Sequence, residues 1–132
     1  MSDTDRRIAE LAARQHNVID TRDLRGLGVS ASAVRRRSAD MRLRRVHRGV
    51  YAVGQLSQKG RWLAAVRAVA PGAVLSHRDA AALHGLRRCD RRVIEVTTSR
   101  HLRPRPGVVI HQTRALHPHD RSSAAGIPVT SV

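Results

Sequence analysis

The segment SASAVRRRSADMRLRRVHRGVYAV, residues 30–53, has to fold while it carries seven arginines and a single acid. Three of the arginines are consecutive, at positions 35–37, and four more follow within the next eleven residues. Like charges at this density repel one another, so the fold must turn them toward solvent or toward an anionic partner. A short helix followed by a hairpin, with the basic side chains on a shared outward side, meets that requirement.

The helical period predicts one exposed face for the first part of this segment. A helix over residues 31–40 begins after a serine cap, which is either Ser30 or Ser32. With Val34 at the centre of the buried side, the helical step of about 100° directs Ser32, Arg35, Arg36 and Ala39 outward. The same step keeps Ala31, Ser38 and Met41 on the buried side and leaves Arg37 on the flank.

Two further helices precede this one, and a hairpin follows it. Residues 3–16 have amphipathic helical spacing, NVID is a short extended piece, and Thr21 is a candidate cap for a brief helix that Gly28 ends. After residue 42 the period changes to that of two short strands around a turn at Gly49. Three helices followed by a hairpin form a winged helix-turn-helix, which the sequence places at residues 1–54.

The charge falls where a helix-turn-helix contacts double-stranded DNA. The helix after the turn enters the major groove, and flanking cations contact phosphates. Base contacts are therefore expected from Arg36, with Ser32 and Arg35 beside it, and phosphate contacts from Arg37, Arg42, Arg44, Arg45 and Arg48. The alternative is a merely solvated arginine face, because Lys59 is the sole lysine among 25 basic residues, a bias that a GC-rich genome produces by itself. The element order favours DNA binding, and the formal net charge of +15 agrees with it.

Residues 55–132 are predicted to form a small α+β module, so the fold class of the chain is α+β. One helix directs Trp62, Leu63, Val66 and Val69 inward and stops at Pro71 and Gly72, and a second begins after Ser76 with Ala80, Leu83 and Leu86 inward. Three extended runs follow at residues 91–99, 106–113 and 126–132.

Catalytic, metal and membrane functions are not favoured by the sequence. Cys89 is the only cysteine, so no internal disulfide forms, and nothing around it marks an activated nucleophile. The histidine pairs 117/119 and 77/84 lack the i, i+4 spacing of helical metal ligands, so we expect no metal and no cofactor. The absence of a long apolar run and the acidic start predict a cytoplasmic protein with no membrane contact.

The stretches LRRVHRGVYAVG, GRWLAAVRAVAPGAVLSHRDAAALHGL, IEVTTS and GIPVTSV occur in this order and resemble the AbiEi-type antitoxin family of type IV toxin-antitoxin systems, in its actinobacterial form. The resemblance implies an N-terminal winged helix-turn-helix, an antitoxin-type domain over residues 55–132, repression of the protein's own operon and a cognate toxin as partner. Many relatives continue into an endonuclease-like domain. The sequence stops at Val132, before the place of that domain, and truncation of the antitoxin-type domain at its C-terminus stays open.

The sequence therefore predicts a DNA-binding regulator that is not an enzyme and that forms a homodimer on DNA. Two alternatives stay open: a toxin-binding interaction module, and a remnant of a larger nuclease-like protein without its catalytic domain. Nuclease activity is disfavoured because Glu95 has no neighbouring lysine and Asp90 lies among arginines. A docking surface is disfavoured because Trp62, Leu86 and Val108 are expected to be core residues.

Overall fold

The computed structural model describes residues 2–69, 71–88, 93–103, 105–114 and 116–131, so Cys89 and Asp90 lie outside the described residues. The chain divides into two compact units, Met1–Ala64 and Ala65–Val132. The division falls inside helix α4 (Gln58–Val69), later than the boundary at residues 54–55 that the sequence suggested, and that boundary stays a prediction.

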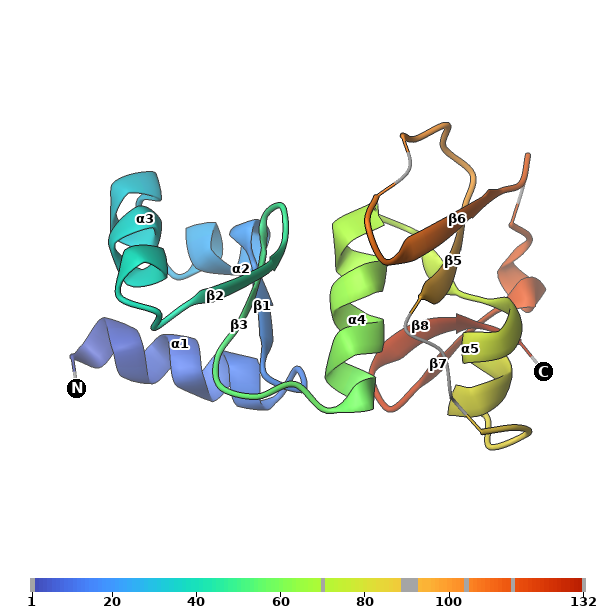
Figure 1. The fold of residues 1–132 in the computed structure, drawn as a ribbon, viewed down its shortest axis with the longest axis horizontal. Helices are drawn as coiled ribbons and strands as arrows, with labels where there is room; N and C mark the ends of the chain where they lie inside the picture. The colour runs from blue at the N-terminus through green and yellow to red at the C-terminus, as the bar shows by residue number, and fades with distance from the viewer. Residues whose placement is uncertain (1, 70, 89–92, 104, 115, 132) are drawn as a thin grey trace. The chain divides into compact units, whose positions relative to one another are not determined.

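The first unit has the element order of a winged helix-turn-helix (Figure 1). Its three helices are α1 (Asp3–Ala13), α2 (Thr21–Gly26) and α3 (Ala31–Ala39), and its strands are β1 (Val18–Asp20), β2 (Arg44–His47) and β3 (Val50–Ala52). The strands form an antiparallel sheet in the order β1-β3-β2. The predicted α+β fold with an N-terminal winged helix-turn-helix is confirmed.

Short polar side chains set where the helices of this unit begin. Ser30, and not Ser32, caps α3, because its hydroxyl accepts a hydrogen bond from the amide of Ala33 at 3.2 Å. Helix α2 is capped by Asp20 in a reciprocal pair with Asp23, which corrects the expectation that Thr21 is the cap. Asp20 thus sets where α2 begins, and Ser30 sets where α3 begins after the turn.

The core of the first unit joins residues from all three helices and the sheet region: Ile8, Ala12, Ile19, Leu24, Val29, Ala33 and Leu43. On α3, Ala33 is buried and Val34 is half-buried against this core, and Ser32, Arg35, Arg36 and Ala39 are exposed as predicted. The inward positions predicted for Ala31 and Met41 were wrong. Met41 follows the end of α3 at a φ of 61° and is 68% exposed, because the helical step no longer applies there.

The turn of the β2–β3 hairpin is bonded to the start of α2. The carbonyl of Gly49 accepts hydrogen bonds from the amide of Thr21 at 3.0 Å and from its hydroxyl at 3.2 Å. Gly49 has a φ of 76°, and a β-carbon there would lie 3.1 Å from the Thr21 hydroxyl oxygen. The hairpin is therefore held to the helix-turn-helix by backbone geometry that favours glycine.

Replacing Gly49 by alanine is expected to lower the free energy of unfolding by about 1–2 kcal/mol, because alanine disfavours the left-handed region and crowds Thr21. Chemical denaturation measures the change. Gly26→Ala is the matched control, because Gly26 is helical and no atom lies within 4 Å of the place that a β-carbon would take, so this variant should be neutral or slightly more stable. An equal decrease in the free energy of unfolding in both variants would show that the glycine conformation of the hairpin turn does not stabilise the unit.

The second unit carries a five-stranded sheet in the order β6-β5-β4-β8-β7, in which β5–β6 and β4–β8 are parallel pairs. Its elements after α4 are β4 (Val74–Leu75), α5 (His77–Leu83), β5 (Ile94–Thr98), β6 (Val108–Gln112), a 3-10 turn (Pro118–Asp120), β7 (Arg121–Ala124) and β8 (Ile127–Thr130). The helices and strands predicted for this region are present.

Most of the core predicted for this region is buried, including Trp62, Leu63, Val66, Val69, Ala80 and Val108. The inward position predicted for Leu86 was wrong: it is 67% exposed, because α5 ends at Leu83 and the chain turns at Gly85 with a φ of 80°. Leu83 itself is half-buried. Among the described residues, no helix has both the length and the apolar character needed to cross a membrane.

Candidate nucleic-acid interface

The outward face of α3 presents two arginines whose side chains have no hydrogen bond or ion pair in the part of the chain that the structure describes. Ser32, Arg35 and Arg36 are all exposed, and the structure gives no hydrogen bond or ion pair to either guanidinium group from any residue that it describes. The Ser32 hydroxyl lies 3.2 Å from that of the capping residue Ser30. This face can therefore donate several hydrogen bonds to an incoming ligand without first breaking internal ones.

The hairpin adds a second group of exposed arginines. Arg44 and Arg45 begin β2, and Arg48 lies in the turn before β3. The Arg44 guanidinium donates a long hydrogen bond, 3.4 Å, to the carbonyl of Gly54, whereas Arg45 and Arg48 have no partner in the described part of the chain. An irregular register between Arg45 and His47 bends the strand here, as a β-bulge does, and re-aims the side chains beside it.

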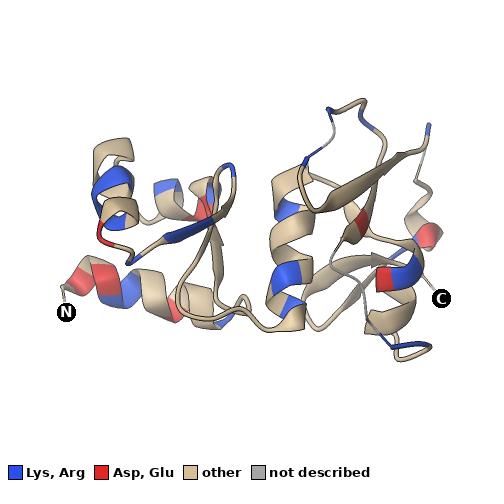
Figure 2. Cartoon of the chain, in the orientation of Figure 1, with Lys and Arg blue, Asp and Glu red and all other residues tan. Residues whose placement is uncertain are grey.

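These basic groups lie on elements that follow one another in the first unit (Figure 2). Blue ribbon segments lie on α3, α2, β2 and the hairpin turn, and red segments lie at the start of α1, with further red beside α2 and after α3. From residue 30 to residue 53, Asp40 is the only acid, so little negative charge offsets the arginines of α3 and the hairpin. The local field therefore attracts polyanions more strongly than an evenly mixed surface would.

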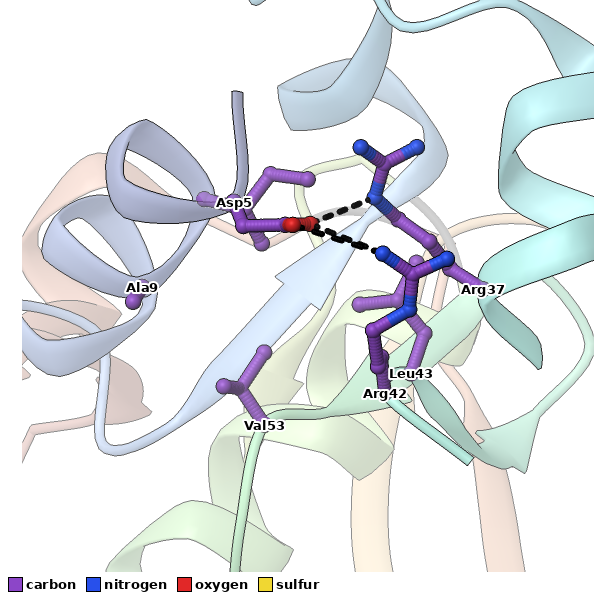
Figure 3. Close-up of a pocket in the computed structure, with 7 residues that line it drawn as sticks. Asp5, Ala9, Arg37, Arg42, Leu43 and Val53 are labelled. Carbon is purple, nitrogen blue, oxygen red and sulfur yellow. Dashed lines mark hydrogen bonds and ion pairs between the residues drawn. The ribbon is translucent and has the colours of Figure 1, made fainter. Parts of the chain in front are cut away.

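Arg37 and Arg42 have an internal partner, Asp5 of α1 (Figure 3). The Nε of Arg37 donates to Asp5 Oδ1 at 2.9 Å, and Nη1 of Arg42 lies 3.3 Å from Oδ2. The Arg37 side chain is only 11% exposed, whereas that of Arg42 is 46% exposed and also pairs with Asp40. A phosphate contact by Arg37 stays untested, and this half-buried ion pair disfavours it. Arg42 keeps an exposed side.

Asp5 borders a cavity of about 330 Å³, whose lining is Asp5, Ile8, Ala9, Arg37, Arg42, Leu43 and Val53 (Figure 3). Hydrogen bonds from the Ser2 hydroxyl and from Arg37, together with the positive charges of Arg37 and Arg42, hold the pKa of Asp5 below its ordinary value. The carboxylate thus fastens the N-terminus of α1 to the end of α3 and to the residues after it.

Asp5→Asn is expected to destabilise the protein near neutral pH, because the amide keeps no charge to pair with Arg37 and Arg42. The lowered pKa of Asp5 means that its contribution is present above the ordinary aspartate pKa and is lost as pH falls through the lowered value. In urea unfolding, the variant should therefore have a lower free energy of unfolding than the wild type near neutral pH, and this difference should become smaller in acid.

Asp40→Asn is the matched control for this prediction. Asp40 is 61% exposed and, in the described part of the chain, pairs with Arg42 alone, so its removal should have the smaller effect. If the difference in free energy of unfolding between wild type and Asp5→Asn stays constant from neutral to acidic pH, the ion pair does not stabilise the contact between α1 and the end of α3.

Two exposed arginines on α2, Arg22 and Arg25, were not among the DNA contacts predicted from the sequence. They lie three residues apart on the helix that precedes α3, and in helix-turn-helix proteins this first helix crosses the DNA backbone. These candidate phosphate contacts could have been predicted from the sequence, because the second helix was predicted and both of these residues are positively charged.

The element order of the first unit, with exposed arginines on α3 and the hairpin, is that of a winged helix-turn-helix, a module that regulators of transcription carry. Residues 6–54 match the family described as "Transcriptional regulator, AbiEi antitoxin". The resemblance to AbiEi-type antitoxins is thus confirmed over this segment, which takes in α3 and the whole hairpin, and the family is one of regulators rather than a class of enzymes. No curated protein matches the chain.

Proposed function

We propose that this protein is an antitoxin-type repressor that binds double-stranded DNA through α3 and the β2–β3 hairpin. The observation that carries the proposal is the set of exposed guanidinium groups without partners among the described residues, namely Arg35, Arg36, Arg45 and Arg48, in a segment that matches a family of transcriptional regulators. Desolvating an arginine costs less when no internal ion pair has to be broken, so these residues are the best suited to an external anion.

The two groups of arginines have different roles in this proposal. Arg36, with Arg35 and Ser32 beside it, faces outward from the helix that follows the turn, where side chains reach base edges in the major groove. Arginine matches the paired O6 and N7 acceptors of guanine. Arg44, Arg45 and Arg48 lie on the hairpin and contact phosphates, which fix the register of the protein on the duplex. Arg42, through its exposed side, and Arg22 and Arg25 on α2 contact phosphates as well.

Arg45→Ala is expected to weaken binding to every duplex by a similar factor and to reduce the slope of log K against log salt by about 0.9, the value for one phosphate contact. Fluorescence anisotropy of a labelled duplex, titrated with the full chain at several salt concentrations, measures both quantities. A cognate duplex and a scrambled one of equal length should respond alike, because phosphates carry no sequence information.

Arg100→Ala is the matched control, because it removes the same charge from an exposed residue of the second unit. The proposal predicts little change in the salt slope for this variant. If Arg100→Ala and Arg45→Ala reduce the slope equally, the protein attracts DNA through its net charge and not through the hairpin.

Repression of the protein's own operon, and neutralisation of a cognate toxin, are the finer parts of the proposal, and the family description supports both. A reporter driven by the DNA upstream of the gene should be repressed by the wild-type protein and released by Arg36→Ala. A homodimer on DNA stays a prediction: one winged module spans few base pairs, and a footprint with two symmetric half-sites would support pairing.

A further inference from the structure

Three potential metal ligands meet in the second unit, outside the proposed DNA interface. They are His77 at the start of α5, Glu95 on β5 and His111 on β6, and one ligand atom from each lies within 4.8 Å of the other two. His77 is exposed, His111 is half-buried and Glu95 is buried, so the cluster runs from the sheet to the surface. Two imidazoles and one carboxylate are a donor set that borderline divalent metals favour.

Strand pairing brings the two residues of the sheet together. Strands β5 and β6 are parallel with Thr97 opposite His111, and Glu95 lies two residues before Thr97 on the same face. On the other side of β5, the amide of Ser76 donates to the carbonyl of Glu95 at 3.0 Å, which sets the next residue, His77, over this face. The cluster therefore depends on two features: the backbone hydrogen bond from Ser76, just after β4, to Glu95 on β5, and the pairing register of β5 with β6.

The side chains already interact with one another. Nε2 of His111 lies 3.2 Å from Oε1 of Glu95, and the rings of His77 and His111 stack with centroids 3.9 Å apart. The other oxygen of Glu95, Oε2, accepts a hydrogen bond from the amide of Arg78 at 3.1 Å. A single proton between His111 and Glu95 thus occupies the place where a cation would share both atoms.

We propose that His77, Glu95 and His111 bind a divalent transition metal of the zinc type. The metal would replace the proton between His111 and Glu95, and His77 would add a second imidazole. Zinc bonds of about 2.0–2.2 Å place ligand atoms roughly 3.3 Å apart, so the donors have to close by on the order of 1 Å. His77 can supply that movement, because it is the exposed member of the cluster. Three protein ligands leave a coordination position for water.

The neighbouring hydrogen bonds orient the ligands, as hydrogen bonds behind the ligands of metal sites do. Nδ1 of His77 lies 2.9 Å from the Ser76 hydroxyl, which accepts a hydrogen bond from Thr97 at 2.7 Å. The amide of Glu95 donates to the buried carboxylate of Asp79 at 2.8 Å. With Nδ1 engaged by Ser76, the Nε2 atom of His77 is the one left to face a metal.

His77 also has an unusual backbone. Its φ is 54°, in the left-handed region that a residue with a β-carbon rarely adopts. Such conformations are unfavourable for a residue with a β-carbon and gather at functional sites. In this conformation the ring of His77 stacks on that of His111.

Cobalt binding to the full chain tests the proposal. After treatment with a chelator, the protein is titrated with Co²⁺, and the visible absorption of the bound ion reports ligand number and geometry. The expected result is a single Co²⁺ site, from which Zn²⁺ displaces the bound Co²⁺. His77→Ala and His111→Ala should each weaken Co²⁺ binding by about tenfold or more and change the spectrum. Glu95→Gln should weaken it as well, and its side-chain oxygen still accepts the hydrogen bond from Arg78, which keeps the fold.

A His117→Ala/His119→Ala double variant is the matched control. These two histidines are exposed and stacked with their ring centroids 5.6 Å apart, and they are the other adjacent pair of imidazoles among the described residues. The control should bind Co²⁺ as the wild type does. The proposal is overturned if the wild type binds no Co²⁺, if the His77 and His111 variants bind it unchanged, or if the control variant alone loses it. None of these readouts depends on DNA.

The expectation of no metal site rests on the spacing of histidines that are close along the chain. That comparison paired His77 with His84, whose Nε2 instead contacts the carbonyl of Thr130 at 2.8 Å. His111 comes from a strand that no helical spacing connects to His77. Only the parallel pairing of β5 with β6 joins them.

Discussion

Arg36→Ala is expected to weaken binding to the cognate duplex by about 1–3 kcal/mol, or about 5- to 150-fold, and to leave binding to a scrambled duplex nearly unchanged. The reason is that Arg36 is exposed on the outward face of α3 with no partner among the described residues, so its loss should remove the proposed base contact without disturbing the fold. Gel-shift titrations on both duplexes at one salt concentration measure the two affinities.

Arg45→Ala is the comparison variant for this prediction, because it removes the same charge from the hairpin. It should weaken both duplexes alike, so the ratio of cognate to scrambled affinity should fall for Arg36→Ala and stay constant for Arg45→Ala. If Arg36→Ala lowers both affinities by the same factor, then α3 is not a recognition helix, and the arginines at 35–37 form only a charged face.

Leu24→Ala is expected to lower the free energy of unfolding by about 2–5 kcal/mol. Leu24 is 1% exposed on α2, and its side chain belongs to the core that joins α1, α3 and the sheet region. Its carbonyl also accepts the amide of Val29 at 2.9 Å, which closes the turn before α3. Losing this side chain leaves a cavity under the helix-turn-helix, and chemical denaturation followed by circular dichroism measures the cost.

Leu86→Ala is the matched control, because Leu86 is 67% exposed and a surface leucine contributes little. Its effect should stay within about 0.5 kcal/mol. If the two leucine variants lose equal stability, the core assigned to the first unit is not what holds it together. DNA binding by Leu24→Ala should fall in proportion to the unfolded fraction and recover at lower temperature if the unit refolds.

Local signals predicted the first unit well. Caps and periodicity mark α1, α2 and α3, and the change of period after residue 42 marks the hairpin, because these features act within a few residues of one another. The outward positions of Arg35 and Arg36 also follow from one helical step. Local signals thus located these elements, although the cap of α2 and the inward position of Ala31 were predicted wrongly.

The errors concern contacts between distant segments and residues just beyond helix ends. Asp5 and Arg37 meet because α1 packs near the end of α3, and nothing in the run of three arginines shows that one of them has a carboxylate partner. Met41 and Leu86 lie just beyond helix ends, where an extrapolated helical step misplaces them. The cluster of His77, Glu95 and His111 depends on strand order, which short-range spacing does not contain.

Selection of bound duplexes from a random pool by the full chain is the most direct test of sequence-specific DNA binding by the first unit. We expect the wild-type protein to enrich a guanine-containing motif, and a parallel selection with Arg36→Ala to lose the enriched guanine. Two symmetric copies of the motif about one helical turn apart would also show the expected dimer. If the wild-type protein retains DNA but enriches no motif over successive rounds, it binds duplexes only through charge, and the claim that α3 recognises bases is contradicted.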